Sequence, residues 1–193
     1  VFAVVVADVA HRLETDAGYL RKVGGGITFS GGEPLAQPDF LFDTLDRLEG
    51  THRAIETSGF APASVFDRLL PRIDQILLDL KLMNPEAHRH WTGQSNELIL
   101  ANLERLRHAG IPLLVRIPLI PGVNDTVENL DATAERLRGF PSLIRVELLP
   151  YQQTAGAKYA LLGRSYEPGF DETRPVRSDA DPFLSRGIPC VVY

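Results

Sequence analysis

The sequence is poor in cysteine, and Cys190 is the only one among its 193 residues. A single cysteine excludes an internal disulfide framework and any cysteine-rich metal site within these residues. Dense basic blocks are also missing and the net charge is -5, so neither nucleic acid nor an anionic membrane is an electrostatically favoured partner. No apolar run reaches the length that spans a bilayer. We therefore expect a cytoplasmic protein.

The first seven residues are apolar but include neither a methionine nor the basic residues that open a signal peptide. We expect a chain that starts within a longer protein. A length of 193 residues suffices for one domain with a sizeable core. No repeat or low-complexity segment divides the chain, so the sequence predicts a single domain over residues 1–193.

The most informative run is Gly-Gly-Gly-Ile-Thr-Phe-Ser-Gly-Gly-Glu-Pro at 24–34. Its β-branched and aromatic centre predicts a buried strand, and the flanking glycines favour close approach of the backbone to a ligand. Glu33 places a carboxylate where a phosphate-binding loop would carry a lysine. The ligand group at this loop is therefore expected to be cationic, such as an ammonium group.

Short apolar runs recur along the rest of the chain and are separated by segments with helical periodicity. We expect strands at 53–57, 75–79, 112–116, 144–148 and 188–192. Strands that alternate with helices through short connections are typical of a parallel α/β sheet with right-handed crossovers. We prefer a parallel (β/α) partial TIM-type barrel over a doubly wound sheet, because nothing signals a reversal of strand order.

Two helix starts are predicted from capping residues. Ser95 is expected to cap the helix before the strand at 112–116. Asp125 and Glu128 are expected to form a capping box before a helix with Val127, Leu130 and Leu137, which Gly139 closes.

Polar side chains follow the predicted strands, at the edge where ligands bind in both kinds of parallel sheet. Asp79 and Lys81 are two residues apart, so they point to the same side if the strand persists. Together with Glu33 and Glu56 they suit a zwitterion, because lysine pairs with a carboxylate and the acids with an ammonium group. For Asp79 and Lys81 alone, a local salt bridge is the simpler interpretation.

Arg116 and Cys190 have less specific interpretations. Arg116 either contacts the ligand or pairs with a neighbouring carboxylate, and both alternatives stay open. Cys190 in the last strand is expected to be a buried small side chain.

Several motifs, in one order and spacing, resemble those of the glycyl-radical-enzyme activases among the radical S-adenosylmethionine (SAM) enzymes. This group includes the pyruvate formate-lyase activating enzyme. The resemblance extends from residue 23 to about residue 168. The motifs lie at 24–34, 55–59 (Ile-Glu-Thr-Ser-Gly), 78–84 (Leu-Asp-Leu-Lys-Leu-Met-Asn), 116–122 (Arg-Ile-Pro-Leu-Ile-Pro-Gly) with Asn124 and Asp125, and 147–151 (Glu-Leu-Leu-Pro-Tyr).

The resemblance implies that Gly31, Gly32 and Glu33 bind the amino group of SAM through backbone and side chain. Gln152 stands where relatives often have a histidine after Leu-Pro-Tyr. A glutamine can still hydrogen-bond a carboxylate, but it adds no positive charge.

The other site residues are implied in the same way. Asp79 and Lys81 would hold the ribose and carboxylate end of SAM, with Leu80 contributing its main chain. Glu56, Thr57 and Asp79 match positions that in relatives can gather a monovalent cation beside the SAM carboxylate.

In the family reaction, a reduced [4Fe-4S] cluster cleaves SAM into methionine and a 5'-deoxyadenosyl radical. That radical abstracts a hydrogen atom from a glycine of a partner, the glycyl radical enzyme, and an electron donor such as flavodoxin or ferredoxin reduces the cluster. The family binds its cluster through Cys-x-x-x-Cys-x-x-Cys after the first strand, and this chain has no such motif. The resemblance thus implies a radical SAM core without its first strand and cluster loop, inactive alone.

Two other function classes stay open. One is a Schiff-base lyase or aldolase on a barrel, with Lys81 as nucleophile and Asp79 or Glu56 as base. The other is a non-catalytic SAM-binding module that has lost its cluster.

Overall fold

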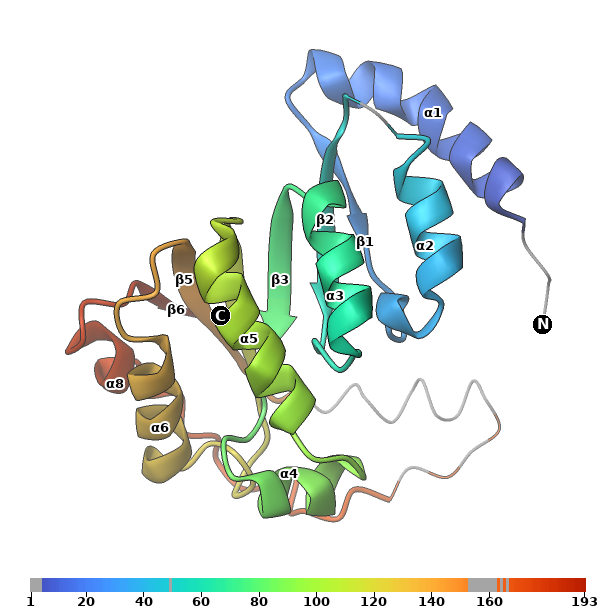
Figure 1. The fold of residues 1–193 in the computed structure, drawn as a ribbon. Helices are drawn as coiled ribbons and strands as arrows, with labels where there is room; N and C mark the ends of the chain where they lie inside the picture. Colours follow the sequence, from blue (N-terminus) through green and yellow to red (C-terminus); the bar gives the residue numbers. More distant parts are fainter. Residues whose placement is uncertain (1–4, 49, 153–162, 164, 166) are drawn as a thin grey trace. The chain divides into compact units, whose positions relative to one another are not determined.

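The computed structural model describes residues 5–48, 50–152, 163, 165 and 167–193 (Figure 1). The strands are β1 Gly26–Phe29, β2 His52–Thr57, β3 Gln75–Asp79, β4 Leu113–Leu119, β5 Leu143–Pro150 and β6 Cys190–Val192. The α-helices are α1 Val6–Lys22, α2 Pro38–Leu45, α3 Ala63–Leu69, α4 Pro85–Thr92, α5 Glu97–Ala109, α6 Val127–Leu137 and α8 Asp181–Leu184. Two 3-10 helices, η1 Pro34–Ala36 and η2 Leu70–Arg72, complete the described elements.

The strands form one sheet whose order, β1-β2-β3-β4-β5-β6, follows the sequence. β1 pairs in parallel with β2, placing Phe29 opposite Ile55, and β2 pairs in parallel with β3. β5 and β6 are also parallel, with Val146 opposite Cys190. Parallel strands in sequence order, with helices between most of them, confirm the predicted α/β class and fit part of a (β/α) barrel.

The contacts divide the chain into two compact units. Unit 1 comprises Val1–Asp79, Asn96–Leu114 and Pro141–Leu143, and unit 2 comprises Leu80–Ser95, Val115–Phe140 and Ile144–Tyr193. Each unit draws on several separated stretches of the chain. The single domain over residues 1–193 stays a prediction.

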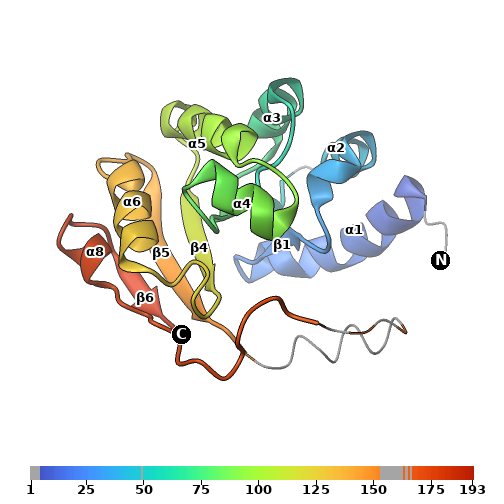
Figure 2. The same cartoon turned by 90° about the horizontal axis from the view of Figure 1, so that it is seen from below.

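Unit 1 buries the apolar faces of its helices against the sheet. Helices α2, α3 and α5 lie on the same face of β1, β2 and β3 (Figure 2). Leu45 of α2, Phe66 of α3 and Leu106 of α5 are fully buried in this layer. The helix cap differs from the prediction, because α5 begins after Asn96 rather than Ser95.

Unit 2 packs α6 and α8 together, and Leu130 and Leu137 of α6 are fully buried (Figure 2). The predicted capping box is wrong: Thr126 caps α6 by accepting a hydrogen bond from the Asn129 amide, and Val127 is 46% exposed. Asp125 cannot serve as the cap because its carboxylate accepts from the Gly122 and Arg177 amides instead.

Helix α1 was not predicted from the sequence. It buries only two small residues, Ala10 and Ala17, although Val6, Val9, Leu13 and Leu20 stand at helical spacing in the sequence. In the part of the chain that the structure describes, no helix has the length and apolar character needed to cross a membrane.

Candidate functional site

The two glycines of the loop after β1 differ in backbone conformation. Gly31 has φ +128, a conformation that favours glycine. Gly32 has no such φ, and an added Cβ would meet no described atom within 4 Å. Gly32 also lines a cavity of about 370 Å³ between β1, α1 and α2. Since the described chain does not itself require glycine at position 32, the residue suits a ligand that approaches the backbone closely.

Glu33 fixes this loop to the end of β2 through both carboxylate oxygens. Oε1 accepts from the Leu35 amide at 3.1 Å and from the Thr57 hydroxyl at 2.6 Å. Oε2 accepts from the Ser58 amide at 2.9 Å and the Ser58 hydroxyl at 2.6 Å. A carboxylate has about four acceptor directions, and donors of the chain itself fill all four. Glu33 therefore holds the loop in place, and its direct contact with an amino group stays a prediction.

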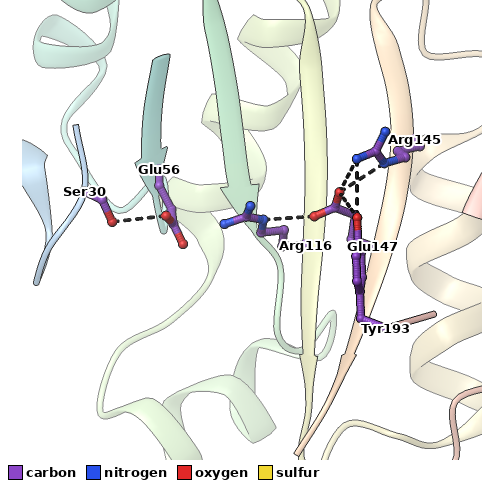
Figure 3. A network of polar contacts seen from close by, with 6 residues as sticks. All are labelled: Ser30, Glu56, Arg116, Arg145, Glu147 and Tyr193. Atoms are coloured by element: carbon purple, nitrogen blue, oxygen red, sulfur yellow. Dashed lines mark hydrogen bonds and ion pairs between the residues drawn. The ribbon is translucent and has the colours of Figure 1, made fainter. Parts of the chain in front are cut away.

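Glu56 lies beside the same loop. Its Oε2 accepts a hydrogen bond from the Ser30 hydroxyl at 3.0 Å (Figure 3). The parallel register places Phe29 opposite Ile55, so the next residues of the two strands, Ser30 and Glu56, meet. The ends of β1 and β2 thus carry two acidic groups, one facing each side of the strands.

Thr57 is buried and points away from the Glu56 side of the strand. Its hydroxyl donates to Glu33 and accepts from the Gly59 amide at 3.0 Å. The monovalent cation at Glu56, Thr57 and Asp79 stays a prediction. Among the described residues, no group of three or more His, Cys, Asp or Glu side chains could hold a metal ion.

In the segment after β3, buried and half-buried side chains alternate. The zwitterion interpretation requires this, because Asp79 and Lys81 must lie on the same side of the chain. Leu80 and Leu82 are buried, whereas Asp79 and Lys81 are half-buried, so the last two share a side. The Leu80 amide donates to the Arg116 carbonyl at 2.9 Å, which continues the pairing of β3 with β4 by one residue.

The predicted site residues are distributed over both units. Unit 1 brings Gly31, Gly32, Glu33, Glu56, Thr57 and Asp79 to the carboxyl ends of neighbouring strands. Leu80, Lys81, Arg116 and Gln152 belong to unit 2. Their convergence on one ligand stays a prediction. Gln152 itself is exposed and follows Tyr151, whose hydroxyl donates to the Glu172 carboxylate.

Arg116 pairs with a carboxylate, one of the two alternatives left open. Its Nε donates to Glu147 Oε2 at 3.0 Å, while Arg145 and the Tyr193 hydroxyl donate to Oε1 at 2.7 and 3.1 Å (Figure 3). Glu147 is only 4% exposed. Burial by itself would raise the pKa of Glu147, but the hydrogen bonds from Arg145, Arg116 and Tyr193 outweigh it and lower that pKa.

Sequence reasoning missed Glu147 and Arg145, although a signal was present. Both alternate with apolar Val146 and Leu148 in β5, which places opposite charges two residues apart on one face. Nothing in the sequence pairs Tyr193, the last residue, with them.

Cys190 does not suit an iron-sulfur cluster. It is half-buried in β6, and burial raises its pKa to about 11. Cluster ligands are thiolates, and a [4Fe-4S] cluster requires several of them. The residues of this chain therefore do not fit the cluster.

The parallel sheet and its polar strand ends are those expected of a protein of the radical SAM class. The sequence model of the Radical SAM superfamily matches residues 6–137, and the chain belongs to this superfamily. Its members use SAM and a [4Fe-4S] cluster, which confirms the predicted cofactors at the level of the family.

Curated relatives of the chain include several activating enzymes. The chain is 35% identical to the (2S)-3-sulfopropanediol dehydratase activating enzyme of Klebsiella oxytoca, over 97% of this chain and 62% of that protein. It is 37% identical to the 4-hydroxyphenylacetate decarboxylase activating enzyme of Clostridioides difficile (strain CD196), over 97% of this chain and 61% of that protein. The chain thus spans about three-fifths of the length of these relatives. The resemblance to the activase group is confirmed.

Solved structures with similar folds include an activating enzyme. A domain of pyruvate-formate lyase-activating enzyme from Bacteroides vulgatus superposes with a TM-score of 0.70 at 34% identity, over 88% of this chain and 99% of that domain. Streptococcus suis SuiB bound to S-adenosylmethionine gives a TM-score of 0.72 at 14% identity, over 100% of this chain and 44% of SuiB. The second match shows the fold alone.

Proposed function

We propose that this chain is the SAM-binding part of an activating enzyme for a glycyl radical enzyme. The observation that carries the proposal is Gly32, which lies in the loop at the carboxyl end of β1, where neither its own φ nor its described neighbours require a glycine. A ligand whose polar group lies against the backbone explains it, and the amino group of SAM is such a ligand. The identity to activating enzymes over 97% of the chain supports the same function.

Each residue of the site has a separate task. Glu33 holds the loop rigid, so that the backbone at Gly31 and Gly32 receives the amino group without reorganising. Asp79, Leu80 and Lys81 bind the ribose and the carboxylate, with the lysine as the cationic partner. Gln152 hydrogen-bonds the same carboxylate. Glu56 and Asp79, with Thr57, gather a monovalent cation beside it.

In the whole protein, a reduced [4Fe-4S] cluster would supply the radical chemistry that activates the partner enzyme, and the residues of this chain would hold SAM for it. The cluster is held by residues outside these 193, because Cys190 does not fit it. A flavodoxin or ferredoxin supplies the electron. The chain alone therefore binds SAM without cleaving it.

The partner is a glycyl radical enzyme, and sequence identity does not select which one. The relatives are named for the activation of a sulfopropanediol dehydratase, a 4-hydroxyphenylacetate decarboxylase and an isethionate sulfite-lyase, at 35%, 37% and 38% identity. These values are too similar to favour one partner. The identity to these activating enzymes favours this function over a Schiff-base lyase that uses Lys81.

Calorimetric titration of SAM into Gly32→Ala tests the proposal. We expect binding weaker by about tenfold, because the new methyl group occupies the space of the ligand. Gly18→Ala is the matched control: Gly18 lies in α1, and an added Cβ there also meets nothing within 4 Å. Equal SAM affinity of both variants and the unmodified chain would overturn the assignment of the loop.

A further inference from the structure

Two buried asparagine side chains bind the backbone of the residue proposed to hold the SAM carboxylate. The Lys81 carbonyl oxygen accepts from Asn124 Nδ2 and from Asn129 Nδ2, each at 3.0 Å. All of these residues belong to unit 2. Two neutral donors converging on one carbonyl fix both its position and its direction.

The Asn129 side chain makes two hydrogen bonds to the backbone of the segment that follows β3. Besides donating to the Lys81 carbonyl, it accepts a hydrogen bond from the Met83 amide through Oδ1 at 2.9 Å. Residues two apart on a strand present such a carbonyl and amide to a neighbouring strand. Since β3 ends at Asp79, the Asn129 side chain takes the place of a strand neighbour for the residues that follow.

Asn124 is itself held by the loop between β4 and α6. Its Oδ1 accepts from the Ile120 amide at 2.6 Å, and Nδ2 also donates to the Pro118 carbonyl at 2.8 Å. The second Nδ2 hydrogen of Asn129 goes to the Asn124 carbonyl at 3.0 Å. Asn124 is 2% and Asn129 is 8% exposed, and both side-chain amides have all their hydrogens engaged. A buried network that is fully satisfied has one favoured geometry.

This network includes a residue of a sequence motif to which the proposed site gives no role. The run Ile-Pro-Gly-Val-Asn-Asp at 120–125 contains Asn124 at its fifth position, after the turn at Gly122 with φ +68. The run thus joins the end of β4 to the segment after β3. We propose that Asn124 and Asn129 are positioning residues that set the place of Lys81 against the carboxylate of SAM.

The inference rests on the proposed function for the role of Lys81, so its test uses two ligands. Asn129→Leu removes the side-chain amide at similar size, and Asn129→Asp keeps the acceptor for the Met83 amide. Thr133→Val is the control, because this buried hydroxyl of α6 donates to the Asn129 carbonyl and not to Lys81. SAM and decarboxylated SAM, which lacks the carboxylate, are titrated into each chain.

We expect Asn129→Leu and Asn129→Asp to weaken SAM binding by about tenfold. Decarboxylated SAM should change by less than about twofold with the neutral leucine variant, because the coupling requires the carboxylate. Thr133→Val should leave both affinities unchanged. Equal losses for the two ligands in Asn129→Leu, or no loss for SAM, would overturn the positioning role.

A second measurement does not depend on any ligand. Met83 is the only methionine of the sequence, so chain labelled with 13C-methyl methionine gives a single methyl signal from this segment. The signal should shift or broaden in both Asn129 variants and keep its place in Thr133→Val. If the unmodified chain binds neither ligand, the proposed function fails for this chain, and the Met83 signal still decides whether Asn129 positions the segment. An unchanged signal in Asn129→Leu would refute the inference.

Discussion

Glu33 and Ser58 are joined by two hydrogen bonds to one carboxylate oxygen, from the Ser58 amide at 2.9 Å and its hydroxyl at 2.6 Å. The two residues lie in the loops after β1 and β2, so the contact fixes neighbouring strand ends to each other. A carboxylate that accepts four hydrogen bonds makes the glycine loop rigid before any ligand arrives.

Glu33→Gln should lower the free energy of unfolding by about 1–3 kcal/mol, because the new NH2 group faces donors and leaves at least one unpaired. Urea denaturation measures the change from the midpoint at constant slope. The control is Glu14→Gln on the exposed side of α1, which should stay within about 0.5 kcal/mol. Equal stability of the two variants would contradict the role assigned to Glu33.

Gly31→Ala and Gly32→Ala should differ in stability although the residues are neighbours. Gly31 has φ +128, so alanine there should cost about 1–3 kcal/mol. Gly32 has no such constraint and should change stability by no more than about 0.5 kcal/mol. Thermal unfolding of both variants measures the difference. A large loss in Gly32→Ala would show that the chain itself requires that glycine.

Glu147→Gln should destabilise the chain by about 3 kcal/mol at neutral pH, because it leaves the guanidinium groups of Arg116 and Arg145 without their buried carboxylate. Urea denaturation again gives the value. Glu128→Gln, an exposed carboxylate in the first turn of α6, is the control and should have little effect.

The loss in Glu147→Gln should depend on pH. The pKa of Glu147 is lowered in the folded state, so its contribution is complete above the ordinary carboxyl pKa. That contribution is lost as the pH falls through the lowered value. The gap in stability between the unmodified chain and the variant should therefore be constant above the ordinary carboxyl pKa of 4.5 and shrink over the pH range below it. A gap that stays constant over this range would argue against the ionised network.

Cys190 should react slowly with thiol reagents in the folded chain. Burial raises its pKa from 9.0 to about 11, which lowers the thiolate fraction at neutral pH by about 100-fold. Absorbance with an aromatic disulfide reagent, in buffer and in denaturant, measures both rates. Equal rates in the two solutions would contradict the burial of this thiol.

Local patterns in the sequence predicted the elements whose burial repeats regularly. The strand at 75–79 was predicted with the bounds that β3 has, because its central residues are apolar and flanked by polar ones. Helix α1 was missed although Val6, Val9, Leu13 and Leu20 lie at helical spacing in the sequence. The start of α6 was predicted from the wrong residues, because Asp125 and Thr126 are both favourable N-cap residues. In the structure the Asp125 carboxylate is hydrogen-bonded within the preceding loop, so Thr126 is the cap.

The sequence by itself determined the α/β class, the strand ends where the site is proposed and the membership in the radical SAM superfamily, since these depend on periodicity and on motifs within short stretches. Only the tertiary structure decided the partners of the polar side chains. Glu33 is engaged by residues 24 and 25 positions away, and Lys81 is held by Asn124 and Asn129 from beyond another strand. Such hydrogen bonds join residues distant along the chain, and their geometry exists only once the strands have paired and the loops have closed.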